Sequence, residues 1–229
     1  MLSFADFADR RDAGRQLAQA LGRFKGSDPL VLALPRGGVP VGFEIAEALG
    51  AELDVLIVRK IGAPGQEELG IGAIVDGDHP VVVINDYVAA MVGADARYIE
   101  AAKQRQLAEV ERRKLAYRGT APDPVVSGRT VIVVDDGIAT GGTMKAALRA
   151  LRARGPARLI LAVPLAPPDS IAELARECDE VVCLLQPTPF YAIGGHYADF
   201  GQTSDEEVVR LLAAAKQARQ KTASGGAPA

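Results

Sequence analysis

Residues 131–144 read VIVVDDGIATGGTM, and this stretch points to the fold class. Four apolar residues make a strand-length run, two adjacent acids end it, and a loop of small residues leads into a helix. An apolar run without polar alternation is typical of a strand buried on both faces, as in a parallel sheet covered by helices. In such sheets ligands bind beyond the carboxyl ends of the strands, where these acids lie.

Other strand-length apolar runs alternate with helical segments along the chain. The expected strands are 30–34, 53–58, 130–134, 159–163 and 181–185, and the helices between them are 39–49, 142–154 and 169–177. This alternation predicts an α/β fold, doubly wound around a mainly parallel sheet with right-handed crossovers.

The remaining segments flank or interrupt this pattern. A helix is expected over 6–24, a hairpin over 73–84, a long charged helix over 95–117 and a last helix from Ser204, where Glu207 completes a capping box. We therefore expect a single domain over 1–215, an insertion with a hairpin and a helix at 71–120, and a disordered tail at 216–229.

Composition excludes several classes of protein. Of 229 residues, 48% are hydrophobic and 24% charged, which excludes an intrinsically disordered chain. A net charge of −3 gives no overall positive field, so we expect no nucleic acid and no membrane among the partners. No apolar run approaches the roughly 18 residues of a membrane span, and the first residues carry charges where a signal peptide would be apolar. We expect a cytoplasmic protein.

The residues after the strand at 130–134 suit a sugar phosphate. Asp135 and Asp136 can accept hydrogen bonds from two neighbouring hydroxyls, such as those of a ribose. The loop that follows places backbone N–H groups and two hydroxyls at the first turn of a helix, which favours a phosphate. Its residues are Ala139, Thr140, Gly141, Gly142 and Thr143. Together these features match a ribose 5-phosphate.

This strand, acid pair and threonine-glycine loop resemble the signature of the type I phosphoribosyltransferases. DDGIATGGTM looks most like the adenine phosphoribosyltransferase form of the motif, and RKIGAPG at 59–65 is similar to the segment before that enzyme's mobile loop. The resemblance covers 30–70 and 125–165 in motif detail. It implies transfer of a 5-phosphoribosyl group from phosphoribosyl pyrophosphate, nucleotide salvage and a homodimer.

The resemblance also implies a pyrophosphate site. Arg36, Gly37 and Gly38 lie where the family has its pyrophosphate loop, and they suit it because glycines let backbone N–H groups approach and arginine binds phosphate oxygens. We expect a cis peptide at Leu34-Pro35, since an X-Pro bond prefers trans by only about 0.5–1 kcal/mol. Of Arg59 and Lys60, which alternate in an extended segment, only one can point at the ligand, and Lys60 is favoured.

A mobile flap and a hood complete the implied site. Residues 61–71 read as a mobile loop that would close over the substrate, with Glu68 as the candidate to contact the incoming base or its proton. A hood at 186–203 is rich in aromatic residues, which suits stacking on a planar base. The base-pocket candidates are Phe190, Tyr191 and Tyr197. The resemblance also disfavours a 6-oxopurine as the base, because family members that recognise 6-oxopurines have an acidic residue where this sequence has Ala139. The base itself stays unassigned.

A divalent cation is expected because phosphoribosyl pyrophosphate brings several phosphate groups to a net-negative protein. Mg²⁺ binds phosphate oxygens and water with one or two protein carboxylates, so Asp135 and Asp136 would reach it through the sugar hydroxyls or water and not as a dedicated metal cage.

Two functions remain open at this point. The first is a phosphoribosyltransferase that acts on a nitrogenous base or amine. The alternative is a non-catalytic protein of the same fold that binds phosphoribosyl pyrophosphate or a nucleotide and regulates a partner.

Overall fold

A five-stranded parallel sheet forms the centre of the protein. The structure is a computed structural model that describes residues 5–77 and 79–224. The strands follow the order β2-β1-β6-β7-β8, and every neighbouring pair is parallel. They are β1 (Leu30–Ala33), β2 (Glu52–Val55), β6 (Thr130–Val134), β7 (Arg158–Leu165) and β8 (Glu180–Leu185). The expected doubly wound α/β fold is confirmed.

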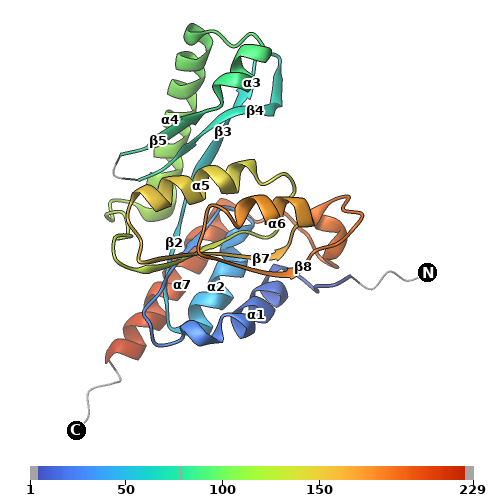
Figure 1. Cartoon of the computed structure of the whole chain (residues 1–229). Helices are drawn as coiled ribbons and strands as arrows, with labels where there is room; N and C mark the ends of the chain where they lie inside the picture. Colours follow the sequence, from blue (N-terminus) through green and yellow to red (C-terminus); the bar gives the residue numbers. More distant parts are fainter. Residues whose placement is uncertain (1–4, 78, 225–229) are drawn as a thin grey trace.

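Helices cover both faces of this sheet (Figure 1). Since successive strand residues point to opposite faces, Val131 and Val133 pack in the cluster that includes α5, whereas Ile132 packs with α1 and α2. The helices are α1 (Arg10–Ala20), α2 (Gly38–Leu49), α5 (Gly142–Ala153), α6 (Pro168–Leu174) and α7 (Asp205–Ser224). No described helix is both long enough and apolar enough to cross a lipid bilayer.

A second, antiparallel sheet extends away from the main body (Figure 1). Its strands, in the order β3-β4-β5, are β3 (Val58–Ala63), β4 (Gln66–Val75) and β5 (Val81–Ile84), and the helices α3 (Asp86–Met91) and α4 (Ala96–Arg118) follow them. Ile61 and Ile71 pack in one apolar cluster with Val110 of α4. The same cluster includes residues of α2 and α7, so this small unit shares an apolar core with the main body.

Two sequence expectations need correction here. The strand expected over 53–58 is divided between the two sheets, because β2 ends at Val55 and β3 begins at Val58. Between them Leu56 N–H still bonds Ala33 of β1, at 2.9 Å, whereas Ile57 exchanges two 2.9 Å bonds with Asp76 at the end of β4. The segment 61–71, expected as a mobile loop, forms most of the β3–β4 hairpin, because its backbone groups pair across the two strands.

The chain ends also differ from expectation. The first helix is α1, followed by a single 3₁₀ turn (Gly22–Phe24), and not one helix over 6–24. Helix α7 continues to Ser224, so residues 216–224 are helical and only 225–229 of the expected tail lie outside the described residues. Ala215 of this helix packs in the same apolar cluster as Ile61, Ile71 and Val110.

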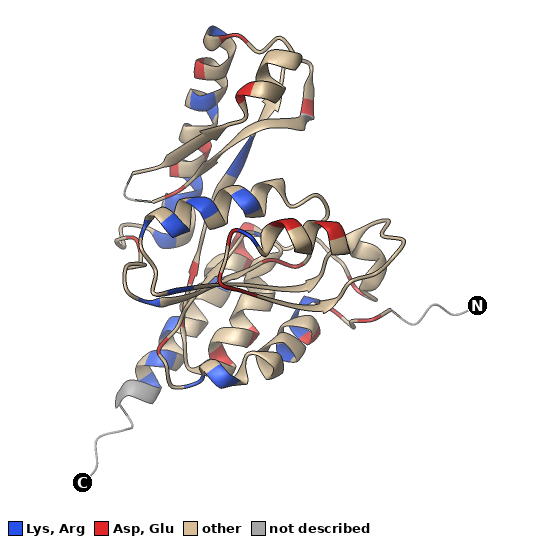
Figure 2. Ribbon diagram, viewed as in Figure 1, with Lys and Arg blue, Asp and Glu red and all other residues tan. Residues whose placement is uncertain are grey.

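Many charged side chains form ion pairs, and basic and acidic residues are interspersed along the ribbon (Figure 2). Basic residues of α5 face acidic residues of α6 and of the segment that follows it. The pairs are Lys145 with Glu173, Arg149 with Glu177 at 2.6 Å, and Arg152 with Asp179 at 2.8 Å. Such exposed pairs add little stability individually.

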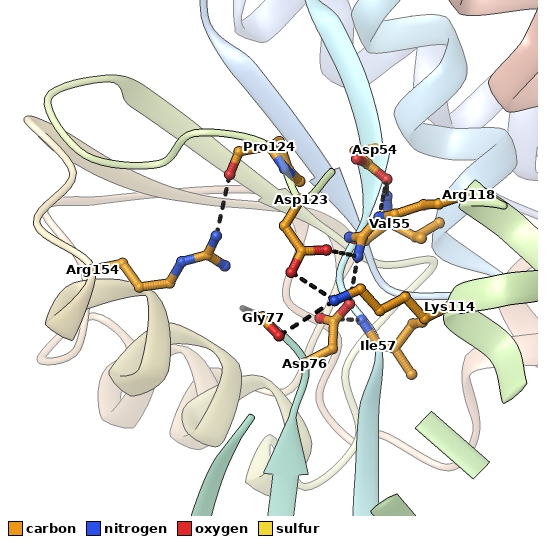
Figure 3. A network of polar contacts seen from close by, with 10 residues as sticks. All are labelled: Asp54, Val55, Ile57, Asp76, Gly77, Lys114, Arg118, Asp123, Pro124 and Arg154. Carbon is orange, nitrogen blue, oxygen red and sulfur yellow. Dashed lines mark hydrogen bonds and ion pairs between the residues drawn. The ribbon is translucent and has the colours of Figure 1, made fainter. Parts of the chain in front are cut away.

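One ion-pair network is buried and connects the two sheets (Figure 3). Arg118, the last residue of α4, is 5% exposed, and its guanidinium lies 2.7–2.8 Å from carboxylate oxygens of Asp54, Asp76 and Asp123. It also donates to the carbonyl of Val55. Burial raises the pKa of Asp76 to about 6, although Arg118 acts in the opposite direction. The network therefore joins β2, the end of β4 and the segment after α4.

We expect Arg118→Met to lower the free energy of unfolding by about 3–5 kcal/mol, because it leaves buried carboxylates without their partner. Denaturant unfolding would measure this. The matched control is Arg112→Met on the same helix, whose exposed pair with Glu109 should contribute less than about 1 kcal/mol. Equal losses in the two variants would contradict a special role for the network.

Candidate functional site

Two loops meet where β1 and β6 end side by side. Leu34 N–H continues the strand pairing with a 2.8 Å bond to the carbonyl of Val134, so residues 35–38 lie next to Asp135 and Asp136. A Cβ on Gly37 would lie 2.1 Å from Asp136 Oδ2, and one on Gly38 would lie 2.8 Å from the Val134 carbonyl. A side chain at either glycine would therefore overlap the end of β6 or the acid that follows it. The structure thus brings the predicted pyrophosphate loop and the acid pair together.

The two acids have different surroundings. Asp135 Oδ1 accepts a 2.9 Å bond from the N–H of Asp136. Burial, and then the neighbouring Asp136 carboxylate, raise the pKa of Asp135 well above its usual range. Asp136 Oδ2 instead accepts a 2.7 Å bond from Nε of Arg10, and both side chains are 13% exposed. Arg10, which lies outside every sequence motif, thus compensates one charge of the pair.

The predicted phosphate loop precedes α5. Gly141 is the N-cap of α5 and has a φ of +75°, which glycine adopts without strain. Ala139, Thr140, Gly142 and Thr143 are exposed or half-buried. The carbonyl of Ala139 accepts a 2.9 Å bond from the hydroxyl of Ser170, which fixes the loop against α6. The first N–H groups of a helix have no partner within it, so this accessible end can receive an anion.

Arg36, in the predicted pyrophosphate loop, faces the start of α7. Its Nη1 lies 3.8 Å from Oδ1 of Asp205, which also accepts a 2.6 Å bond from the hydroxyl of Tyr117. The cis peptide bond of this loop lies between Pro35 and Arg36, one bond after the expected position at 34–35. An argument from the low cost of cis X-Pro bonds could not find it, because the bond precedes an arginine.

The two basic residues of β3 alternate as expected. Arg59 donates from Nε to Gln106 of α4 at 3.0 Å, whereas the stem of Lys60 lies against Gly70 of β4, where an added Cβ would be 3.3 Å from Lys60 Cδ. Arg59 is therefore engaged with α4. Glu68 belongs to β4, but its side chain lies outside the described part of the chain.

The aromatic residues expected to form a base pocket do not form one surface. Tyr197 is 5% exposed, and its ring packs between Phe7 and Phe200 with centroids 5.3 and 5.0 Å away. This corrects the expectation that it stacks on a base, since its ring is covered by other side chains. Its hydroxyl donates to the Asp136 carbonyl at 2.6 Å. Burial, and then the charge of Asp136, raise the pKa of this hydroxyl, which favours its role as a donor.

The other two aromatic candidates differ from each other. Phe190 stacks on His196, with ring centroids 6.2 Å apart, and Tyr191 is 88% exposed. The segment 186–203 does approach the site, because a Cβ on Gly137 would lie 2.7 Å from Ile193.

Comparison with known proteins identifies the family. Residues 8–195 match the family model described as the phosphoribosyl transferase domain. The chain belongs to this family. The match extends from the start of the described N-terminal segment to the 3₁₀ turn after β8 (Ile193–His196), and so includes the acid pair and both glycine loops.

Individual relatives of this phosphoribosyl transferase domain agree with the assignment. Proteins named "Putative phosphoribosyl transferase" from two strains of Mycobacterium tuberculosis, CDC 1551 and H37Rv, are each 50% identical over 206 residues. The match covers 90% of this chain and 46% of each relative, so the chain spans about half their length. The crystal structure of TT1426 from Thermus thermophilus is 44% identical with a TM-score of 0.77, covering 90% of this chain and 97% of that one.

A more distant relative has a different name. A ribose-phosphate pyrophosphokinase of Methanopyrus kandleri is 33% identical over 145 residues, which are 55% of this chain and 49% of that protein.

We expect Gly37→Ala to lower the free energy of unfolding by about 1–3 kcal/mol, because the added methyl group overlaps Asp136. The φ of −62° at Gly37 suits any residue, so the penalty arises from this overlap and not from the backbone conformation. Denaturant unfolding would measure the loss. Gly22→Ala is the control, since nothing lies within 4 Å of its Cβ position. Wild-type behaviour of Gly37→Ala would contradict the close contact.

Proposed function

We propose that this domain transfers the 5-phosphoribosyl group of phosphoribosyl pyrophosphate to a nitrogenous base or amine. One observation carries the proposal: the acid pair at the end of β6 lies between two glycine loops, one against its carboxylates and one leading into α5. A pentose whose hydroxyls bind the acids would then have a phosphate loop for each of its two phosphorylated ends.

The sugar would be held at its vicinal hydroxyls and its 5-phosphate. Asp135 and Asp136 supply the oxygens that accept from the hydroxyls. The N–H groups at the start of α5, with the hydroxyls of Thr140 and Thr143, receive the 5-phosphate. Holding both groups fixes the position of the anomeric carbon, so the energy of binding lowers the activation barrier of the transfer reaction.

The pyrophosphate would lie along the loop of residues 36–38. The N–H group of Gly37 and the guanidinium of Arg36 suit its oxygens, whereas the N–H of Gly38 already donates to the carbonyl of Leu34 at 3.0 Å. Of the two basic residues on β3 we retain Lys60, since Arg59 is bonded to α4. In the reaction the bond from the anomeric carbon to pyrophosphate breaks, and the electron pair leaves with the pyrophosphate. The nitrogen of the acceptor forms the new bond and loses a proton, for which Glu68 is the sequence candidate.

The donor set at the acids fits a magnesium ion. With Asp135 Oδ1 and Asp136 Oδ2 already bonded within the protein, each acid has a second carboxylate oxygen, which would reach Mg²⁺ through the sugar hydroxyls or water while phosphate oxygens bind the ion directly. Bound there, Mg²⁺ would neutralise charge on the departing pyrophosphate.

Two further points support the proposal or extend it. The name of the pyrophosphokinase relative contains both the sugar phosphate and the pyrophosphate, which supports the donor half of the reaction more than any acceptor. Cytoplasmic location, a homodimer and a role in nucleotide salvage are proposed from the family resemblance alone.

The decisive experiment measures pyrophosphate release from phosphoribosyl pyrophosphate and Mg²⁺ with a panel of purines, pyrimidines and other amines. We expect release with at least one acceptor, and a loss of about a hundredfold or more in Asp136→Asn, which weakens the sugar contact. Asp86→Asn, an exposed acid of α3, is the matched control and should keep the wild-type rate.

The outcomes separate the two functions. Binding of phosphoribosyl pyrophosphate without release for any acceptor would favour the regulatory alternative. Full activity of Asp136→Asn would contradict the mechanism, and absence of binding to the wild-type protein would contradict both functions.

A further inference from the structure

Arg10 connects three parts of the protein at the proposed sugar site. Its Nε donates to Asp136 Oδ2 at 2.7 Å, its Nη1 donates to the carbonyl of Gly201 at 2.6 Å, and its guanidinium carbon lies 3.9 Å from the ring centre of Phe200. A planar guanidinium can make these contacts at once because its donors diverge in one plane while its face stacks on the ring.

The segment that carries Arg10 is itself fixed. The N–H of Phe7 donates to the carbonyl of His196 at 3.0 Å, and the carbonyls of Phe7 and Ala8 accept 2.9 Å bonds from Ala198 and Asp199. Phe7 is buried against Tyr197. Asp9 then caps α1 by accepting from the N–H of Asp12 at 2.7 Å, so Arg10 projects from the first turn of a helix whose start is held on the 196–199 segment.

Asp136 is consequently restrained on several sides. Its Oδ2 lies between Arg10 and Gly37, and its carbonyl oxygen accepts from the hydroxyl of Tyr197. The Asp135 carboxylate also lies within hydrogen-bonding reach of the Asp136 side chain. Among the ion pairs of the described residues, Arg10 is the partner of Asp136, and it engages Oδ2 and not Oδ1.

We propose that Arg10 is a positioning residue for the sugar site: by holding Oδ2 of Asp136, it directs Oδ1 toward the vicinal hydroxyls of the pentose. This inference rests on the proposed function, since it assigns the hydroxyl contact to Asp136. It adds a residue from the N-terminal helix, in which the sequence motifs place no site residue.

Two physical reasons favour positioning over competition with the sugar. Arg10 engages the oxygen that already faces Gly37, where a sugar hydroxyl has no room. Its positive charge also offsets the repulsion between two adjacent carboxylates, both of which are half-buried. A well-oriented carboxylate binds a diol better than one that must be ordered first.

The test compares ligands with and without the hydroxyls. Calorimetric titrations would use ribose 5-phosphate, phosphoribosyl pyrophosphate with Mg²⁺, and pyrophosphate with Mg²⁺. We expect Arg10→Met to weaken the binding of the two sugar ligands by about tenfold or more, which is the effect of losing one charge-assisted hydrogen bond at the site. Binding of pyrophosphate alone should not change, and it reports that the variant is folded.

Three further variants sharpen the comparison. Arg10→Lys keeps the positive charge but not the planar guanidinium with its several donors, so it should give an intermediate loss of sugar affinity. Arg11→Met is the matched control, because the neighbouring arginine is half exposed and pairs with Glu44 away from the acids. In an Asp136→Asn background, Arg10→Met should add little further loss, because Arg10 acts through Asp136.

Arg10→Met leaves the largely buried Asp136 carboxylate without its partner, so the free energy of unfolding of each variant is measured beside its binding. Arg10 lines an open cavity of about 250 Å³, so a different side chain there meets solvent and not a closed void.

Each result decides between defined alternatives. Unchanged sugar affinity in Arg10→Met would overturn the inference, and tighter sugar binding would overturn it in favour of competition. Equal loss for pyrophosphate and sugar ligands would also overturn it, because the effect would then be a general disturbance of the site. Failure of the wild-type protein to bind phosphoribosyl pyrophosphate would instead contradict the proposed function.

Discussion

Parallel pairing of β1 with β6 is the constraint on which the site depends. It brings two loops from distant parts of the sequence to the same edge of the sheet, and Gly37 packs directly against the Asp136 carboxylate. A side chain at that glycine would occupy the space of the carboxylate, so the contact requires both the glycine and the strand register. The predicted phosphate loop belongs to the same arrangement, because residues 135–141 connect β6 to α5.

Buried charge recurs at two places in this domain, and in both an arginine at a helix end organises it. Arg118 ends α4 and joins the two sheets through three carboxylates, whereas Arg10 begins α1 and restrains one acid of the site. Isolated buried carboxylates are costly, and a planar guanidinium can satisfy several of them in a fixed geometry. The first arrangement places the antiparallel unit relative to the main sheet, and the second lies at the proposed sugar site.

Sequence patterns were reliable where the signal is local. The apolar runs at 130–134 and 30–34, the acid pair and the helix that begins at Gly142 all occur as expected, because each depends on neighbouring residues only. Expectations failed where the partner is remote. The hairpin of β3 and β4 contains glycines at 62, 65, 70 and 72, which read locally as a loop, yet backbone pairing between the strands orders it. Tyr197 was likewise predicted to stack on a base, but Phe7 and Phe200 cover its ring.

By itself, the sequence determined the α/β fold class, through the short-range periodicity of its apolar runs, and the family, through the resemblance of its acid pair and glycine loop to a known signature. Only the tertiary structure decided which residues surround the acids. Nothing local separates Arg10 from Arg11, which are adjacent on one helix, yet one pairs with Asp136 and the other with Glu44. The difference arises because the 196–199 segment fixes the start of α1, and such contacts between remote segments leave no periodic signal in a sequence.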